Sequence, residues 1–400
     1  MIPIIPYLQL DSLGEYQDKI VDLYRADSAL NQTIPASIRK STEWLLRLVN
    51  CYYSNKIEGN PTHPKELLRT QEQTSTTSSP SAPVLELLKH LEVQINSKKG
   101  LVDKGRVTSQ EYIKGLHRDF YSGLPEEYLR VKDSEGKIAC DESGGEILVV
   151  PGEYRTRDVQ VGMHIPPSSG ELARYMSWVE DVYKLDKIFG LSPVAAAAGL
   201  HHRLAWVHPF QDGNGRTIRL ITDCYMRNAG FGGYGLWSIT RGFGRNTEAY
   251  YKALSAADKS NSGSDGRGIL SEKGLVNFTK YFIDTALDQV NFFTELLEPR
   301  KLGVRIDYYF ELRAKGGLPG SNGEELPLLK ITARDIYRLL LEKGSMSRSS
   351  ICQHLAKGEQ TLRPIFKQME KEGFINAPPK QDVTLLLSAA SVEFLFPHIW

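Results

Sequence analysis

Apolar residues recur at helical spacing along three stretches in the first third of the chain. The first stretch starts at Ser37 and is closed by the Gly-Asn-Pro sequence after residue 58, because glycine and proline end helices. Helical patterning resumes at Val84 and again near Ser109. Residues 70–83, TQEQTSTTSSPSAP, hold too few apolar side chains to pack, so they predict a mobile linker.

The middle of the chain passes from a strand-like pattern to a helical one. Residues 131–166 contain five glycines and a β-branched cluster at 147–150, which predicts a small β-hairpin inserted in a helical protein. Helices then dominate from Ser169 to about Leu297. Glycine-rich loops interrupt them at 230–235 and 261–268.

The last quarter of the chain has its own pattern. Residues 316–327 are rich in glycine and proline, as domain boundaries are. Three helices and short alternating strands at 374–375 and 383–387 follow, in the order of a winged helix-turn-helix. The expected fold is mainly α, a helical core with a small β-hairpin and this C-terminal domain. The expected parts are an N-terminal helical region at 1–108, a core at 109–300 and the winged-helix-like domain at 326–400.

One dodecapeptide, HPFQDGNGRTIR at residues 208–219, carries the strongest chemical signal. The segment before it is apolar on nearly all sides and predicts a buried helix. Gly213, Asn214 and Gly215 break that helix, and a second helix resumes at once and lasts until Gly230. A loop followed by a helix N-terminus offers unpaired N–H groups and a positive dipole end. This geometry is suited to phosphate.

The side chains of the dodecapeptide fit the same chemistry. Arg216 and Arg219 are three residues apart and share one helix face, where two guanidinium groups can hold successive phosphates. Asp212 is a hard oxygen ligand of the kind Mg²⁺ prefers, and His208 is the one candidate base in the motif. Taken singly, a histidine at a helix end or a Gly-x-Gly turn is usually structural and has no catalytic role. A chance match at all eight specified positions of the dodecapeptide, in contrast, is expected only about once in ten billion sequence windows.

Composition and charge exclude several classes of protein. With 49 Lys+Arg against 48 Asp+Glu, the net charge of +1 gives no global field that would recruit nucleic acid or an anionic membrane. No run of 18 uncharged apolar residues predicts a membrane span, and the opening MIPIIPYLQL makes a poor signal peptide. The four cysteines form no C-x-x-C pair, and we expect a cytoplasmic protein. His201 and His202 predict packing or hydrogen bonding rather than a zinc site.

The dodecapeptide resembles the signature of the Fic (filamentation induced by cyclic AMP) domain, H-x-F-x-[D/E]-G-N-G-R-x-x-R, at every specified position. The resemblance extends over roughly residues 37–290, and a C-terminal winged helix is also found among bacterial Fic proteins. It implies a Fic helical core that transfers AMP from ATP to a Tyr, Thr or Ser hydroxyl of a protein target and releases pyrophosphate. The target can be the protein itself. The implied cofactor is Mg²⁺ or Mn²⁺, and relatives of this subclass often form homodimers.

The resemblance also assigns roles within the dodecapeptide. It implies that His208 deprotonates the target hydroxyl and that Asp212 holds Mg²⁺ on the α- and β-phosphates. The implied anion hole consists of Gly213, Asn214 and Gly215. Arg216 is expected near the β-phosphate, Arg219 at the γ-phosphate, and Phe210 in the core as an anchor of the loop.

A second pattern closes the helix that starts at Ser37. In SNKIEGN, residues 54–60, Ser54 and Glu58 are four apart and share a face, and a carboxylate there opposes the helix dipole. From the residues alone, Glu58 is either an incidental surface residue or one that needs a partner. The segment resembles the inhibitory pattern [S/T]-x-x-x-E-[G/N] of many Fic proteins, which implies that Glu58 pairs with Arg219 and blocks the γ-phosphate.

The resemblance suggests two further binding features. Residues 146–162 fit the flap along which the family aligns its target as an added strand, and an ordinary structural hairpin is the alternative. Tyr251 is expected against the adenine, with plain core packing as its alternative. Asp258 stands where the family commonly has asparagine, and an aspartate can still accept from an exocyclic amine.

The expected function is a self-inhibited protein adenylyltransferase. One alternative keeps the fold and uses another phosphate-containing donor, and the other is a nucleotide-sensing transcriptional regulator. From Arg348 to Glu372 there are five Lys+Arg against three Asp+Glu, too small an excess to establish a DNA-binding face. DNA therefore stays an open partner beside dimerisation or protein docking.

Overall fold

The computed structural model describes residues 2–60, 62–67, 81–99, 103–132, 136–263, 265–266, 268–318 and 325–400. The chain forms two compact units. Unit 1 comprises Met1–Ser28, Asn50–Pro61 and Ser81–Val290, and unit 2 comprises Ala29–Val49, Thr62–Pro80 and Asn291–Trp400. Residues 70–80 of the predicted mobile linker lie outside the described residues. Its last residues begin a helix at Ala82. The predicted domain boundaries stay predictions.

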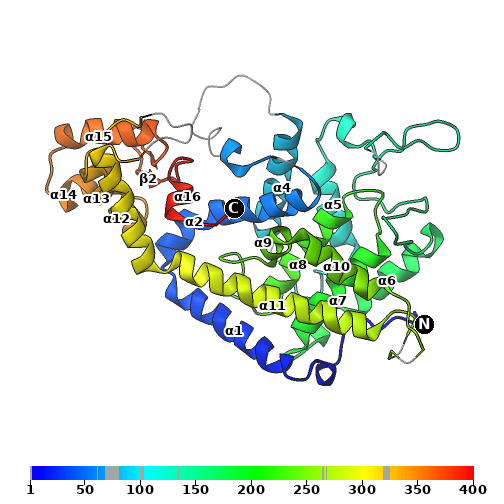
Figure 1. The fold of residues 1–400 in the computed structure, drawn as a ribbon. Helices are drawn as coiled ribbons and strands as arrows, with labels where there is room; N and C mark the ends of the chain where they lie inside the picture. Colours follow the sequence, from blue (N-terminus) through cyan, green and yellow to red (C-terminus); the bar gives the residue numbers. More distant parts are fainter. Residues whose placement is uncertain are drawn as a thin grey trace. The chain divides into compact units, whose positions relative to one another are not determined.

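Helices dominate the described chain, which confirms the mainly α prediction (Figure 1). In the first 300 residues they are η1 Leu10–Leu13, α1 Tyr16–Thr33, α2 Ala36–Ile57, α4 Ala82–Lys99, α5 Gln110–Tyr121, η2 Glu126–Tyr128, η3 Ser169–Glu171, α6 Leu172–Val182, η4 Leu185–Lys187, α7 Ser192–Val207, α8 Asn214–Asn228, α9 Ile239–Arg245, α10 Thr247–Asp258 and α11 Glu272–Leu297. Among the described residues, none of these or later helices has the length and apolar content needed to cross a bilayer.

Helix α7 is the centre of unit 1, and its burial was predicted from its apolar sequence. Residues Val194–Ala198, Leu200 and Leu204 are almost fully buried, and α8 packs beside α7 (Figure 1). The N-terminal segment crosses α7 at Gly199, where a Cβ atom would lie 2.5 Å from the carbonyl oxygen of Pro6. Arg203 of α7 donates from Nε and Nη2 to the carbonyl of Ile5, at 3.0 and 2.9 Å.

Helix α1 is an element that the sequence analysis did not predict. Its apolar residues Ile20 and Leu23 are fully buried at helical spacing, so the signal was present. Asp27 of α1 is buried and accepts hydrogen bonds from Nε1 of Trp237 at 2.7 Å and from the backbone of Gly233 at 3.0 Å. The helix therefore holds the glycine-rich loop that follows α8.

The small β-hairpin predicted within residues 131–166 is present, and its last strand overlaps the start of the predicted flap at 146–162, whose role stays a prediction. Backbone bonds join Val131 to Ile147, Ala139 to Val131 and Ile147 to Ala139, at 2.8–2.9 Å. The first residues of the predicted flap therefore pair with residues before them. A turn at Gly152, which has φ +79°, ends the pairing. The chain then runs irregularly to a single bridge between Val161 and His164.

The C-terminal part of unit 2 contains the predicted helices and strands. Helices α12 Pro299–Lys315, α13 Thr332–Lys343, α14 Arg348–His354 and α15 Glu359–Lys371 precede strands β1 Ile375–Asn376 and β2 Thr384–Leu385 and helix α16 Val392–Leu395. The strands are antiparallel, with Ile375 opposite Leu385 and Asn376 opposite Thr384. The helices and strands are confirmed, and their interpretation as a winged helix stays a prediction.

Candidate phosphate-binding site

The dodecapeptide folds as a short loop between α7 and α8. His208 follows α7 in a left-handed conformation with φ 50° and ψ 63°, and Gly213 precedes α8 with φ 73°. Asn214 is buried and fastens the loop from within: its Oδ1 accepts from the backbone of Phe210 at 2.9 Å and its Nδ2 donates to the carbonyl of Phe210 at 2.8 Å. The side chain of Asn214 thus shapes the loop, and its backbone belongs to the helix start.

Two glycines of the loop are required by their surroundings. A Cβ atom at Gly213 would lie 2.6 Å from Cε2 of Tyr121, and the positive φ already favours glycine. A Cβ atom at Gly215 would overlap Oε1 of Glu58. The Glu58 carboxylate therefore lies directly against the first turn of α8, where backbone N–H groups have no partner within the helix. This is the position that the sequence predicts for an anion.

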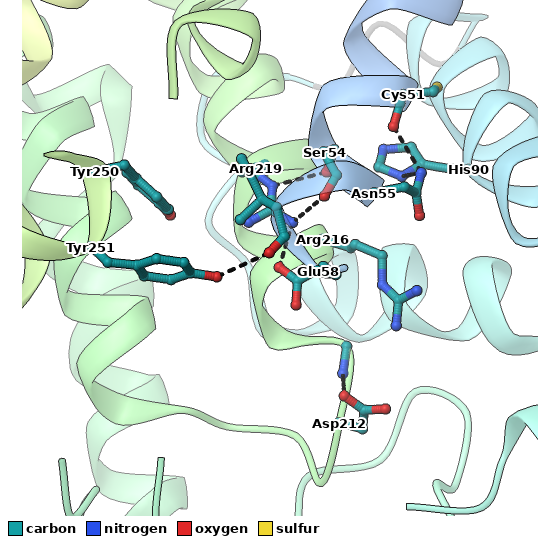
Figure 2. A network of polar contacts seen from close by, with 12 residues as sticks. Cys51, Ser54, Asn55, Glu58, His90, Asp212, Arg216, Arg219, Tyr250 and Tyr251 are labelled. Atoms are coloured by element: carbon teal, nitrogen blue, oxygen red, sulfur yellow. Dashed lines mark hydrogen bonds and ion pairs between the residues drawn. The ribbon is translucent and has the colours of Figure 1, made fainter. Parts of the chain in front are cut away.

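Glu58 forms an ion pair with Arg219, as the resemblance implied. Oε1 of Glu58 lies 2.6 Å from Nη2 of Arg219, whose side chain is 2% exposed (Figure 2). Ser54 completes the contact, since its Oγ accepts from Nε and its carbonyl accepts from Nη2, each at 2.8 Å. Burial alone would lower the pKa of Arg219, but the adjacent Glu58 raises it, so the guanidinium remains charged.

Arg216 has a partner that the sequence did not predict. Its Nη1 lies 3.0 Å from Oε1 of Glu86 in α4, and its Nη2 donates to the hydroxyl of Tyr121 at 3.3 Å. The other oxygen of Glu86 accepts from Nδ2 of Asn60 at 2.9 Å. One carboxylate therefore joins the first motif arginine to the segment that carries Glu58. An acidic residue inside the apolar run VLELL was the available signal.

We expect Glu86→Gln to destabilise the protein by about 1–3 kcal/mol, because it removes the carboxylate that pairs directly with the buried Arg216. If the oxygen of the new amide faces Arg216, its NH₂ faces the NH₂ of Asn60, and two donors then oppose each other. Urea unfolding measures the loss. The control is Glu92→Gln, which removes an exposed pair with Lys89. Equal free energies of unfolding for Glu86→Gln and the parent would contradict this role.

His208 and Asp212 are each partly exposed. Burial lowers the pKa of His208 to about 4, so its imidazole is neutral near pH 7 and can accept a proton. Oδ1 of Asp212 accepts from the backbone of Gly213 at 2.6 Å (Figure 2), and within the described residues its other oxygen has no hydrogen-bond partner. One free carboxylate oxygen fits a Mg²⁺ ion that takes its remaining ligands from phosphates and water. No group of three or more His, Cys, Asp or Glu in the described chain could enclose a metal by itself.

A buried histidine that the sequence analysis missed supports the loop. The ring of His117 in α5 stacks on Phe210 with centroids 3.9 Å apart. Its Nδ1 accepts from the backbone of Gly152 at 2.9 Å, so its Nε2 carries the proton and donates to the carbonyl of Asp212 at 3.1 Å. Phe210 is buried, as expected of an anchor. Nothing in the sequence around His117 distinguishes it from other helix residues.

The predicted adenine residues differ in their surroundings. Tyr251 is half exposed, and its hydroxyl donates to the carbonyl of Ile57 at 3.2 Å, beside Glu58 (Figure 2). Asp258 is engaged elsewhere, because its Oδ1 lies 3.0 Å from Nε2 of the buried His202. His201 is bonded to Thr222 at 2.7 Å and to the hydroxyl of Tyr250 at 2.9 Å, which confirms hydrogen bonding for the histidine pair. The adenine roles stay predictions.

We expect stability to fall as the pH drops from 7 to 5. Burial lowers the pKa of His90 and His201 to about 3 and that of His117 to about 4. Between pH 6.5 and these values the unfolded chain binds more protons, so the free energy of unfolding decreases with falling pH. Each of these histidines is expected to lower the free energy of unfolding by about 1–2 kcal/mol between pH 7 and pH 5. Urea unfolding at several pH values measures the slope, which His90→Gln should reduce and which the exposed His354→Gln should leave unchanged. A flat profile would be the contrary result.

Comparisons with known proteins identify the domain that holds this site. Residues 107–226 match the model of the Fic/DOC family. A protein named protein adenylyltransferase Fic from Culex quinquefasciatus is 44% identical over 80 residues, 20% of this chain and 16% of its own length. A protein of the same name from Drosophila mojavensis is 28% identical over 239 residues, which are 58% of this chain and 40% of the relative's length. The matched part thus spans less than half the length of these relatives.

A solved structure shares the fold. The crystal structure of a Fic family protein from Desulfovibrio desulfuricans G20 superposes with a TM-score of 0.52 at 16% identity, covering 96% of this chain and 98% of that one. The motif, the helical core around it and the family match agree with one another. Residues 107–226 of the chain therefore form a domain of the Fic/DOC family.

Proposed function

We propose that this chain is a self-inhibited protein adenylyltransferase that transfers AMP from ATP to a hydroxyl side chain of a protein target. The observation that carries the proposal is the placement of the Glu58 carboxylate. It lies against Gly215 at the start of α8 and on the guanidinium of Arg219, so it occupies a site built for an anion. The names of the curated relatives supply the nucleotide and the group transferred.

The proposed reaction is an in-line displacement at the α-phosphorus. His208 takes the proton of the target hydroxyl, whose oxygen forms a bond to the α-phosphorus. The bond between that phosphorus and the oxygen bridging to the β-phosphate breaks, and pyrophosphate leaves with the bonding electrons. The backbone at the start of α8 and the guanidinium of Arg219 stabilise the negative charge on the phosphates. Mg²⁺ held by Asp212, when bound, neutralises further phosphate charge.

Inhibition follows from competition for one guanidinium. Arg219 has its Nη2 on Glu58 and on the carbonyl of Ser54, and its Nε on the hydroxyl of Ser54. A γ-phosphate can bind there only after the carboxylate leaves, and two anions at that position would repel each other. Resting transfer should therefore be slow.

The test uses ATP labelled with ³²P at the α position, with the whole chain and its Glu58→Gly variant. Labelled protein formed by the variant, and far less by the parent, is the expected result. GTP and UTP labelled at the α position, and CDP-choline labelled at the phosphorus next to choline, distinguish another donor. Nucleotide binding without label transfer by the variant would overturn the proposal in favour of a nucleotide sensor.

A further inference from the structure

The loop that precedes α6 is bonded to the end of α7 along consecutive backbone carbonyls. Nε2 of His164 lies 2.8 Å from the carbonyl oxygen of Trp206. Arg155 donates from Nη2 to Val207 at 3.5 Å and from Nε to His208 at 2.8 Å. The backbone N–H of Arg155 donates to the carbonyl of Pro209 at 2.9 Å. These are carbonyls that a helix C-terminus leaves without partners of its own.

Arg155 is buried, and its ion pair is long and made with an exposed carboxylate. Its side chain is 0% exposed, and the nearest carboxylate oxygen is that of Asp158, 3.7 Å away on a side chain that is 71% exposed. Its remaining donors bind the carbonyl of Arg157 at 2.9 Å and the carbonyl of Pro167. The negative dipole end of α7 and these carbonyls therefore compensate the charge. Lysine, with a single nitrogen, could not reach all of them.

The position of His208 makes this contact relevant to the reaction. A left-handed backbone is strained for a residue other than glycine, and the surrounding contacts must maintain it. Here Arg155 holds the carbonyl of His208 with its side chain and that of Pro209 with its backbone. The direction in which the imidazole leaves the chain depends on these peptide planes.

We propose that Arg155 is a positioning residue for His208, which fixes the left-handed turn and thereby aims the imidazole at the target hydroxyl. The proposal rests on the function proposed above, in which His208 is the base. Within the described part of the chain, the Arg155 side chain bonds neither the start of α8 nor Arg219, so its effect should fall on the proton-transfer step and leave nucleotide binding intact.

The experiment compares Arg155→Met, Arg155→Lys and the control Arg157→Met in the Glu58→Gly background. Arg157 is half exposed and pairs with Asp141 at the surface. The expected result is a loss of kcat of at least about tenfold for Arg155→Met, a smaller loss for Arg155→Lys and none for Arg157→Met. The dissociation constant for ATP should change less than about twofold. An unchanged kcat, or a parallel loss of ATP binding and thermal stability, would overturn the proposal.

A readout that does not need transfer keeps the two proposals apart. The imidazole resonances of His208, observed by NMR, should shift in Arg155→Met and not in Arg157→Met. The pKa of His208, about 4, should rise when the Arg155 charge is removed, while its other titratable neighbours Asp212 and His164 are unchanged. If the Glu58→Gly parent transfers nothing, the proposed function fails. The positioning role is then judged by these resonances, and their constancy would refute it.

Discussion

Replacing Glu58 by glycine is expected to turn a nearly silent protein into one that gains adenylate in the presence of MgATP. The carboxylate contributes a charge-assisted bond of 2.6 Å to the buried Arg219. Such a bond is worth about 1.5–3 kcal/mol, and its loss frees the guanidinium for phosphate. We therefore expect transfer or self-modification to rise by roughly 10- to 100-fold. Intact-mass analysis, counting chains that carry one adenylate, measures the change.

Two further variants test the reason for that gain. Glu58→Gln retains the length of the side chain and loses its charge, so it should activate less than glycine does. Glu43→Gln lies on the same helix α2, where its carboxylate pairs with Arg47 at the surface, and it should have no effect. If Glu58→Gly transferred no faster than the parent, the inhibitory role of Glu58 would be wrong even though the ion pair exists.

Replacing His208 by alanine in the Glu58→Gly background is expected to have the largest effect on chemistry. A general base contributes on the order of 10²- to 10⁴-fold, and the burial that lowers the pKa of His208 to about 4 keeps it unprotonated at neutral pH. Transfer from labelled ATP should fall by that factor. ATP affinity, measured by titration calorimetry, should remain, because the start of α8 and Arg219 are unaltered.

The control for this variant is His354→Ala, since His354 is exposed and its Nδ1 bonds the carbonyl of Ser350 in its own helix. It should transfer as the parent does. Undiminished transfer by the His208→Ala variant would mean that another group takes the proton. A simultaneous loss of ATP binding would mean that alanine at this position disturbs the loop, since His208 adopts a left-handed backbone there.

The sequence alone determined the features that depend on neighbouring residues. The end of α2, the buried α7 and the loop that opens α8 follow from apolar spacing, helix-breaking residues and the Gly-Asn-Gly sequence, all within a few residues of one another. The same local logic could have found α1, whose apolar spacing was overlooked. The small hairpin within residues 131–166 was also predicted, but the sequence does not reveal which of its short segments pair.

Contacts between distant parts of the chain were accessible only through a resemblance or not at all. Glu58 and Arg219 are separated by 161 residues, and residue chemistry left Glu58 open as a surface residue until the resemblance named its partner. No resemblance named Glu86, 130 residues from Arg216, or Arg155, 53 residues from His208.

The tertiary structure decided these contacts for a physical reason. Arg155 binds backbone carbonyls, which every residue possesses, so no residue type at either end marks the contact in the sequence. His117 stacks on Phe210 and holds the carbonyl of Asp212 because α5 packs beside the loop. Twelve adjacent residues supply the chemical groups of the motif. Its orientation depends on side chains that only folding brings next to them.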